Sequence, residues 1–257
     1  MDSIRTSSLF HFTSKLDNLK TILIEGIKPN YCKEDFAITG TDLKVGIPMT
    51  SFCDIPLTRI TNFTKRYNEY AIGLSKEWGF KNNINPILYA SNEEISRSFH
   101  KIKSIPNLLN SNTNNSIPNQ ISSFSARTSV TYLFGFTKKY EIQRNGKVQC
   151  NYEENEWRYI VPESLNNGNI AKWYWTESEY KNWRGSFKVK PKSIFPALEF
   201  DINDVNFIIL KDESQIPRMI DYIEKINVLG GRGNFDDISK KRLISKIISI
   251  DRIKKDF

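Results

Sequence analysis

Two acidic side chains stand two residues apart in the segment Glu154-Asn155-Glu156-Trp157-Arg158. Side chains two apart on a β-strand point to the same face, so a strand here would present both carboxylates together. Crowded carboxylates raise one another's pKa, and one that stays ionised can stabilise positive charge at a sugar carbon while a glycosidic bond breaks. The alternative is a solvated acidic edge that pairs with Arg158.

The second candidate is His11, one of only two histidines in the chain. It lies in the apolar run 9–13, which predicts a short strand. Ser14-x-x-Asp17 then predicts the start of a helix, and Gly26 its end. Backbone N–H groups at a helix N-terminus favour anionic ligands, so this arrangement suits the pyrophosphate of a dinucleotide. The alternative is a histidine that caps the strand or the helix.

Composition predicts a folded globular protein. The 257 residues, 39% of them hydrophobic, are enough for one large domain with a substantial core. The net charge of +8 indicates anionic partners such as nucleic acid or nucleotides, or simple solubility. We find no apolar run of membrane-spanning length and no signal peptide, so we expect a cytoplasmic protein without membrane contact. Three scattered cysteines predict neither disulfides nor a metal site.

Short apolar runs predict the strands that must position these side chains. They cover residues 49–53, 70–74, 86–90, 187–190, 198–200 and 205–210. Asn145-Gly146 predicts a tight hairpin turn that leads into segment 149–162, whose second half alternates as a strand does.

Helical spacing accounts for the remaining apolar residues. It predicts helices around Ile95 and Phe99, through 130–134, from Pro217, and at the end of the chain with Leu243, Ile244, Ile247 and Ile248 on one face. Residues 104–123 are rich in Asn, Ser and Pro, which predicts a flexible exposed insertion. The aromatic residues between 173 and 183 lie near several basic residues, and they could either stack on nucleic-acid bases or pack in a core.

Several of these segments together resemble one known family. They are Leu9-Phe10-His11-Phe12-Thr13, the helix up to Gly26-Ile27-x-Pro29, Ile47-Pro48-Met49-x-Ser51-Phe52-Cys53-Asp54-Ile55-Pro56-Leu57, Tyr70-x-Ile72-Gly73-Leu74-x-Lys76-Glu77-Trp78 and Glu154-x-Glu156-Trp157-Arg158-Tyr159. The series resembles the AbiGi abortive-infection family of bacterial phage-resistance proteins. This resemblance covers most of residues 1–257, which we treat as a single domain.

More remotely, the opening His-x-Thr before a helix resembles the first motif of DarT-type ADP-ribosyltransferases, which use NAD. That resemblance implies an α+β fold with a split, largely antiparallel sheet and flanking helices. By the same resemblance His11 and Thr13 would hold NAD, Ser51 would lie on the middle strand, and Tyr67 or Tyr70 would stack on nicotinamide. Glu156, or less readily Glu154, would be the catalytic carboxylate.

The resemblance leaves the substrate side and the function open. Arg59 and Arg66 are both candidates for the arginine that DNA-modifying relatives carry after the middle strand. The leading hypothesis is a phage-defence enzyme that uses NAD to modify a macromolecule or nucleotide, with no metal. The alternative is a non-catalytic, antitoxin-like partner of a nucleotidyltransferase-type toxin, which the AbiGi resemblance implies. A third possibility is a basic protein that binds nucleic acid or a phage component.

Overall fold

A computed structural model describes residues 6–36, 44–64, 68–111, 123–144, 146–162, 174–188 and 191–256. The strands are β1 (Ser8–Thr13), β2 (Asn30–Asp35), β3 (Lys44–Cys53), β4 (Tyr70–Ser75), β5 (Asn85–Pro86), β6 (Leu88–Ala90), β7 (Thr137–Lys139), β8 (Glu141–Arg144), β9 (Lys147–Cys150), β10 (Glu156–Ile160), β11 (Trp175–Thr176), β12 (Val205–Leu210) and β13 (Ile247–Ser249).

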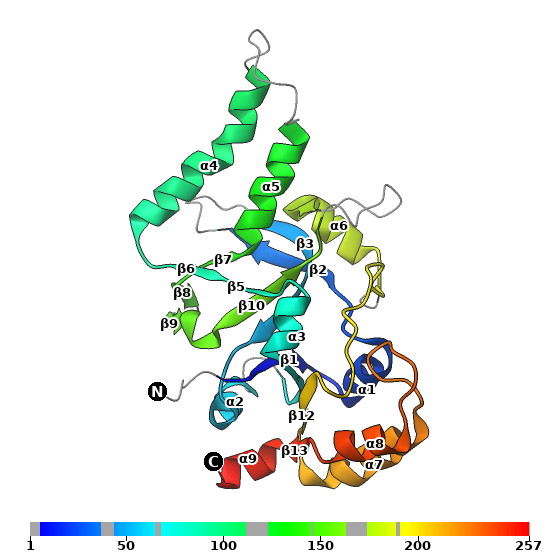
Figure 1. Ribbon diagram of the computed structural model, residues 1–257. Helices are drawn as coiled ribbons and strands as arrows, with labels where there is room; N and C mark the ends of the chain where they lie inside the picture. Colours follow the sequence, from blue (N-terminus) through cyan, green and yellow to red (C-terminus); the bar gives the residue numbers. More distant parts are fainter. Residues whose placement is uncertain are drawn as a thin grey trace.

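The helices lie on both sides of these strands (Figure 1). They are α1 (Leu16–Glu25), η2 (Leu57–Arg59), α2 (Ile60–Thr64), α3 (Lys76–Lys81), α4 (Glu93–Ser111), α5 (Ser123–Gly135), η3 (Tyr152–Glu154), α6 (Glu177–Gly185), η5 (Glu213–Gln215), α7 (Ile216–Lys225), α8 (Asp237–Ile244) and α9 (Ile250–Asp256).

One nine-stranded sheet organises the described residues, and its main path runs β13-β12-β4-β1-β3-β10-β5. Strands β2 and β11 also pair with β3, and β12 with β13 is the parallel pair in a sheet whose other pairings are antiparallel. The chain is therefore an α+β protein with a mostly antiparallel sheet, as the sequence predicted at that level.

Apolar side chains cover both faces of this sheet. The largest cluster joins Leu9 and Phe52 to Leu19 of α1 and Met219 of α7. A second cluster packs Phe10 against Ile60 and Ile253 on the opposite face. A third places Phe134 of α5 over Ile47 and Ile160. Helices therefore cover parts of β3 on both faces of the sheet.

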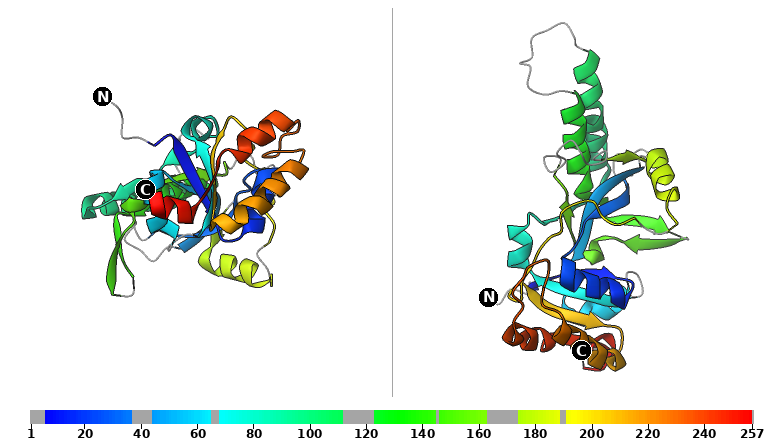
Figure 2. Two further views of the ribbon diagram at one scale, coloured as in Figure 1. Left: turned by 90° about the horizontal axis from the view of Figure 1, so that it is seen from below. Right: turned by 90° about the vertical axis from the view of Figure 1, so that its right-hand side faces the viewer.

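Helices α4 and α5 pair to form an arm that projects away from the sheet (Figures 1 and 2). At its base, Phe99 of α4 meets the Phe134 ring of α5 edge to face at 5.3 Å. Of the insertion predicted over 104–123, residues 104–111 are helical as part of α4, and residue 123 begins α5. Residues 112–122 lie outside the described part of the chain.

Four local predictions need correction. Helix α1 is preceded by Lys15 with no side-chain cap, so Ser14 does not open it. The run 86–90 is divided at Ile87 between β5 and β6, which pair with different strands. Residues 187–188 and 198–200 form no strand, and Leu198 makes one isolated bridge to Ile27.

The expected closing helix is also different. Helix α8 ends at Ile244, and Ile247 and Ile248 belong to β13, which extends the sheet beside β12. Leu243 and Ile244 therefore lie at the end of α8, whereas Ile247 and Ile248 lie in a strand. Pairing with β12 outweighs the helical spacing of these four apolar residues. The predictions for 70–74, 205–210 and the helix from Pro217 are confirmed.

Gly26 ends α1 in a conformation that other residues rarely adopt, with φ of 77°. A Cβ atom there would lie 2.7 Å from the Leu198 carbonyl oxygen. We expect Gly26→Ala to lower the free energy of unfolding by about 1–3 kcal/mol, through backbone strain and this clash. Urea unfolding followed by circular dichroism measures the change.

Gly185 provides the matched control, because a Cβ there meets nothing within 4 Å. Gly185→Ala should leave stability unchanged or raise it by up to about 1 kcal/mol. Equal stability of the Gly26 and Gly185 variants would contradict this account of the end of α1.

Candidate functional site

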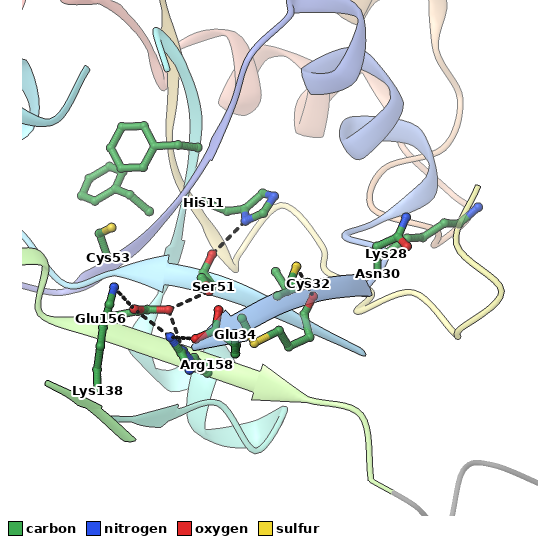
Figure 3. Close-up of a pocket in the computed structure, with 14 residues that line it drawn as sticks. His11, Lys28, Asn30, Cys32, Glu34, Ser51, Cys53, Lys138, Glu156 and Arg158 are labelled. Atoms are coloured by element: carbon green, nitrogen blue, oxygen red, sulfur yellow. Dashed lines mark hydrogen bonds and ion pairs between the residues drawn. The ribbon is translucent and has the colours of Figure 1, made fainter. Parts of the chain in front are cut away.

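A pocket of about 380 Å³ lies between β1, β2, β3 and β10, where the sheet divides (Figure 3). On one side, β3 pairs with β2 from Lys44 to Met49, and with β1 at Cys53. Residues 50–52 lie in the gap between those two neighbours. The division therefore leaves the C-terminal part of β3 beside the pocket.

His11, Ser51 and Glu156 all line this pocket, although the first and the last are 145 positions apart. Strand alternation places the His11 ring on the same face of the sheet as Leu9 and the Glu156 side chain on the same face as Phe10, and Ser51 lies between them. The Nδ1 atom of His11 lies 3.0 Å from the Ser51 carbonyl oxygen. A carbonyl oxygen only accepts, so Nδ1 carries the proton and donates. The Ser51 hydroxyl in turn donates to Glu156 Oε1 at 2.8 Å. Strand register explains the second contact, because Ser51 stands opposite Arg158, two residues along β10 from Glu156.

Arg158 holds the carboxylates of the site in place. Its Nε donates to Glu156 Oε1 at 2.6 Å, and its Nη2 lies 2.9 Å from Glu34 Oε2. Its Nη1 donates to the Gly135 carbonyl oxygen at 2.5 Å. Arg158 is 1% exposed and Glu156 is 6% exposed, so this charge network is buried beneath the pocket. A buried ion pair of this kind fixes geometry more than it adds stability.

Lys138 joins the second acidic residue to the network. Its Nζ donates to Glu154 Oε2 at 2.7 Å and to Glu156 Oε2 at 3.1 Å. The prediction that one strand presents both carboxylates is wrong. Glu154 lies in η3, and the left-handed backbone at Asn155 separates it from β10. The carboxylates meet through Lys138, and Glu154 is not among the described residues that line the pocket.

The surrounding charges keep Glu156 ionised. Burial raises its pKa, but Arg158, Lys138 and the Ser51 hydroxyl outweigh burial and lower the pKa to about 2. Burial also acts to lower the pKa of Lys138, while Glu156 and Glu154 raise it overall. The pocket floor therefore carries a fixed anion held by two cations.

The other predicted site residues lie elsewhere. Thr13 is buried at the end of β1 opposite Tyr70, and Tyr70 packs in the main core with its hydroxyl accepting from Gln215 Nε2 at 2.9 Å. Arg59 is exposed at the end of η2. Of the described residues, none of these three lines the pocket. Tyr67 and Arg66 lie outside the described residues.

Sequence reasoning did not assign Glu34 or Lys138 to the site. The alternation of Asn30, Cys32 and Glu34 along β2 turns all three toward the pocket. The alternation can be seen in the sequence, but the pairing of β2 with β3, which places these side chains at the pocket, cannot. Lys138 comes from the short strand after α5 and carries no local signal.

The remaining candidates do not form a second site. Trp175, Tyr180 and Trp183 pack against the main core, and the Tyr31 ring meets the Trp183 ring at 5.0 Å. Trp173 lies outside the described residues.

Within the described ranges, no group of three His, Cys, Asp or Glu side chains could hold a metal, and we find no helix long and apolar enough to cross a bilayer.

The protein is an α+β protein with a divided sheet. At the division lies a pocket large enough for a small molecule, and a largely buried charge network forms its floor. The model of the AbiGi family, described as abortive phage resistance protein AbiGi, antitoxin, matches residues 25–211. The chain belongs to this family. It is 25% identical over 229 residues to an abortive phage resistance protein AbiGi of Lactococcus lactis subsp. cremoris, covering 82% of this chain and 89% of that protein. No solved structure matches.

Arg158→Met tests the buried network. It leaves the carboxylates of Glu156 and Glu34 without their shared cation, and we expect a loss of about 3–5 kcal/mol in the free energy of unfolding. Arg97→Met is the control, because Arg97 pairs with Glu93 and Glu94 on the exposed face of α4. It should change stability by less than about 1 kcal/mol. Similar values for both variants in urea unfolding would contradict the assignment.

Glu156→Gln tests the ionisation of Glu156. Its folded pKa is lowered, so the stabilisation by its charge is present above the unfolded pKa of about 4.3 and is lost as pH falls toward 2. We therefore expect the stability difference between wild type and this variant to shrink from pH 5 toward pH 2. A difference that stays constant would show that Glu156 is not held ionised. Glu93→Gln, at an exposed position on α4, is the control.

Proposed function

We propose that this chain is a phage-defence protein that takes NAD as a donor substrate and transfers its ADP-ribose to a macromolecule or nucleotide. The observation that carries the proposal is that His11, Ser51 and Glu156 line one pocket, with Ser51 hydrogen-bonded to both of the others. These are the residues to which the resemblance to DarT-type enzymes gives NAD binding, the middle strand and catalysis. The division of the sheet at β3 also fits the split sheet that this resemblance implies.

The pocket fits part of a dinucleotide. Its volume lies within the range of about 300–1,000 Å³ typical of small-molecule sites. Lys28 and Asn30 lie at one side of it and could meet phosphate oxygens. Phe12, an aromatic residue, also lines it. Phe12 would then take the place beside nicotinamide that we first gave to Tyr67 or Tyr70.

Glu156 would act electrostatically. When the bond between ribose and nicotinamide breaks, the sugar acquires oxocarbenium character and positive charge. A carboxylate fixed on the pocket floor stabilises the transition state, in which the sugar is positively charged, more than it stabilises the ground state. This difference lowers the activation barrier. Arg158 and Lys138 keep Glu156 ionised and oriented, so it needs no rearrangement at the moment of reaction.

The second candidate function is a non-catalytic partner of a toxin. It is favoured by the description of the family as an antitoxin. In this case the fold would bind the toxin, and the charge network would serve to hold β3 and β10 in register. NAD turnover separates the two candidates.

The two histidines give a matched test of the enzymatic proposal. We expect purified wild-type protein, incubated with NAD labelled in the adenylate and a bacterial lysate, to label macromolecules or nucleotides and to release nicotinamide. His11→Ala should weaken the reaction by about tenfold or more, equivalent to about 1.4 kcal/mol. His100→Ala, on the exposed part of α4, should react as wild type does. Equal rates for both variants would remove His11 from the site.

Glu156→Gln should lower the transfer rate by about 10²–10³-fold, the range found when one preorganised electrostatic contact to a transition state is removed. Circular dichroism first establishes that the variant is folded under the assay conditions. If the folded variant keeps the full rate, the catalytic role of Glu156 is wrong.

The antitoxin candidate predicts a different result. Co-expressed with a candidate toxin that arrests growth, the wild-type chain should restore growth and co-purify with that toxin. Glu156→Gln, tested at a temperature where it is folded, should do the same. Growth restored by wild type but not by the folded variant would contradict a purely non-catalytic role.

A further inference from the structure

Glu34 is a second carboxylate at the pocket, and the mechanism above does not use it. It lies on β2, with its carboxylate beside Arg158 of β10 (Figure 3). Its side chain is 18% exposed, whereas that of Glu156 is 7% exposed. Of these two, Glu34 is therefore the carboxylate that a molecule entering from solvent reaches more readily.

One guanidinium positions both carboxylates. Arg158 Nη2 lies 2.9 Å from Glu34 Oε2, while Arg158 Nε donates to Glu156 Oε1 at 2.6 Å. Arg158 is itself fixed by Gly135, so neither carboxylate can move independently of it. Arg158 Nη2 also donates to Glu156 Oε2 at 3.2 Å, so the two carboxylates lie beside the same guanidinium nitrogen.

The same surroundings act on the two acids in opposite directions. Burial raises the pKa of Glu34, and the nearby negative charge of Glu156 adds to this, against the lowering effect of Arg158 and Lys138. The pKa of Glu156 is lowered to about 2. Lys28 and His11 also line the pocket, and Lys33 and Asp35 flank Glu34 on β2. Paired acids with separated pKa values are the pattern of one proton-transfer group beside one permanent anion.

We propose that Glu34 is the general base of the transfer reaction and takes the proton from the hydroxyl group, of water or of an acceptor molecule, that attacks the ribose. This inference rests on the function proposed above. The bond between ribose C1′ and the nicotinamide nitrogen breaks, and its electron pair leaves with nicotinamide. The acceptor oxygen forms the new bond to C1′, and its proton passes to Glu34, which later releases it to solvent.

Glu154 is the other acid that could accept this proton, and the geometry disfavours it. Its side chain is 3% exposed and its Oε2 accepts from Lys138 at 2.7 Å. An acceptor would have to displace Lys138 to reach it. Glu34 Oε2 is also paired, with Arg158 Nη2 at 2.9 Å, but the Glu34 side chain is 18% exposed and lines the pocket, so an acceptor can reach it from solvent.

The test measures nicotinamide release from NAD with water as the acceptor. Glu34→Gln keeps an oxygen that can accept from Arg158 but cannot take a proton. We expect its kcat to fall by about 10²–10⁴-fold with KM nearly unchanged, and the acidic limb of the pH–rate profile to disappear. Glu34→Ala should regain part of its rate when formate is added, because formate can serve as the missing base. The rescued rate should rise with the pKa of the added carboxylic acid, because a carboxylate that only refilled the ion pair with Arg158 would show no such dependence.

Asp35→Asn is the control, since Asp35 neighbours Glu34 on β2 and is exposed. It should keep the wild-type rate and pH profile. If wild type turns over NAD and Glu34→Gln shows the same kcat and pH profile, the base assignment fails while the proposed function stands. If wild type releases no nicotinamide, the proposed function fails and this inference fails with it.

Discussion

The buried guanidinium of Arg158 is the charge on which the site depends. An unpaired cation in this position would destabilise the fold by several kcal/mol, so its partners must be present together. They come from β2, β10 and the end of α5, and they meet only if β10 lies beside β3 with Arg158 opposite Ser51. A slip of one residue would turn Arg158 to the other face of the sheet, so this interaction also specifies the strand register.

The arm is tied to the pocket through the same contact. The Gly135 carbonyl oxygen that accepts from Arg158 is at the C-terminus of α5, where the helix dipole favours a cation. Lys138, three residues after Gly135, donates to the carboxylates of Glu154 and Glu156. The end of α5 and the start of β7 thus supply part of the pocket floor. The base of the arm and the pocket are therefore parts of one packed unit.

Local patterns predicted the parts of the fold that depend on neighbouring residues. The strand with His11, the end of α1 at Gly26 and the strand 205–210 follow from apolar runs and a glycine, and the structure has all three. The parts that depend on distant pairing were missed. Ile247 and Ile248 join β12 rather than a helix, and Glu34 reaches the pocket because β2 pairs with β3. The prediction for Glu154 failed because Asn155 takes a left-handed conformation that ends the strand pattern.

The central claim is that the divided sheet forms a binding site for NAD with Glu156 beneath the reacting sugar. The most direct measurement is a crystal structure of the wild-type protein with a non-hydrolysable NAD analogue at saturating concentration. The account predicts electron density for the nicotinamide end in the pocket, with a ribose hydroxyl within hydrogen-bond distance of Glu156 and with His11 contacting the ligand. An empty pocket under these conditions, or an analogue bound on another face of the protein, would contradict it.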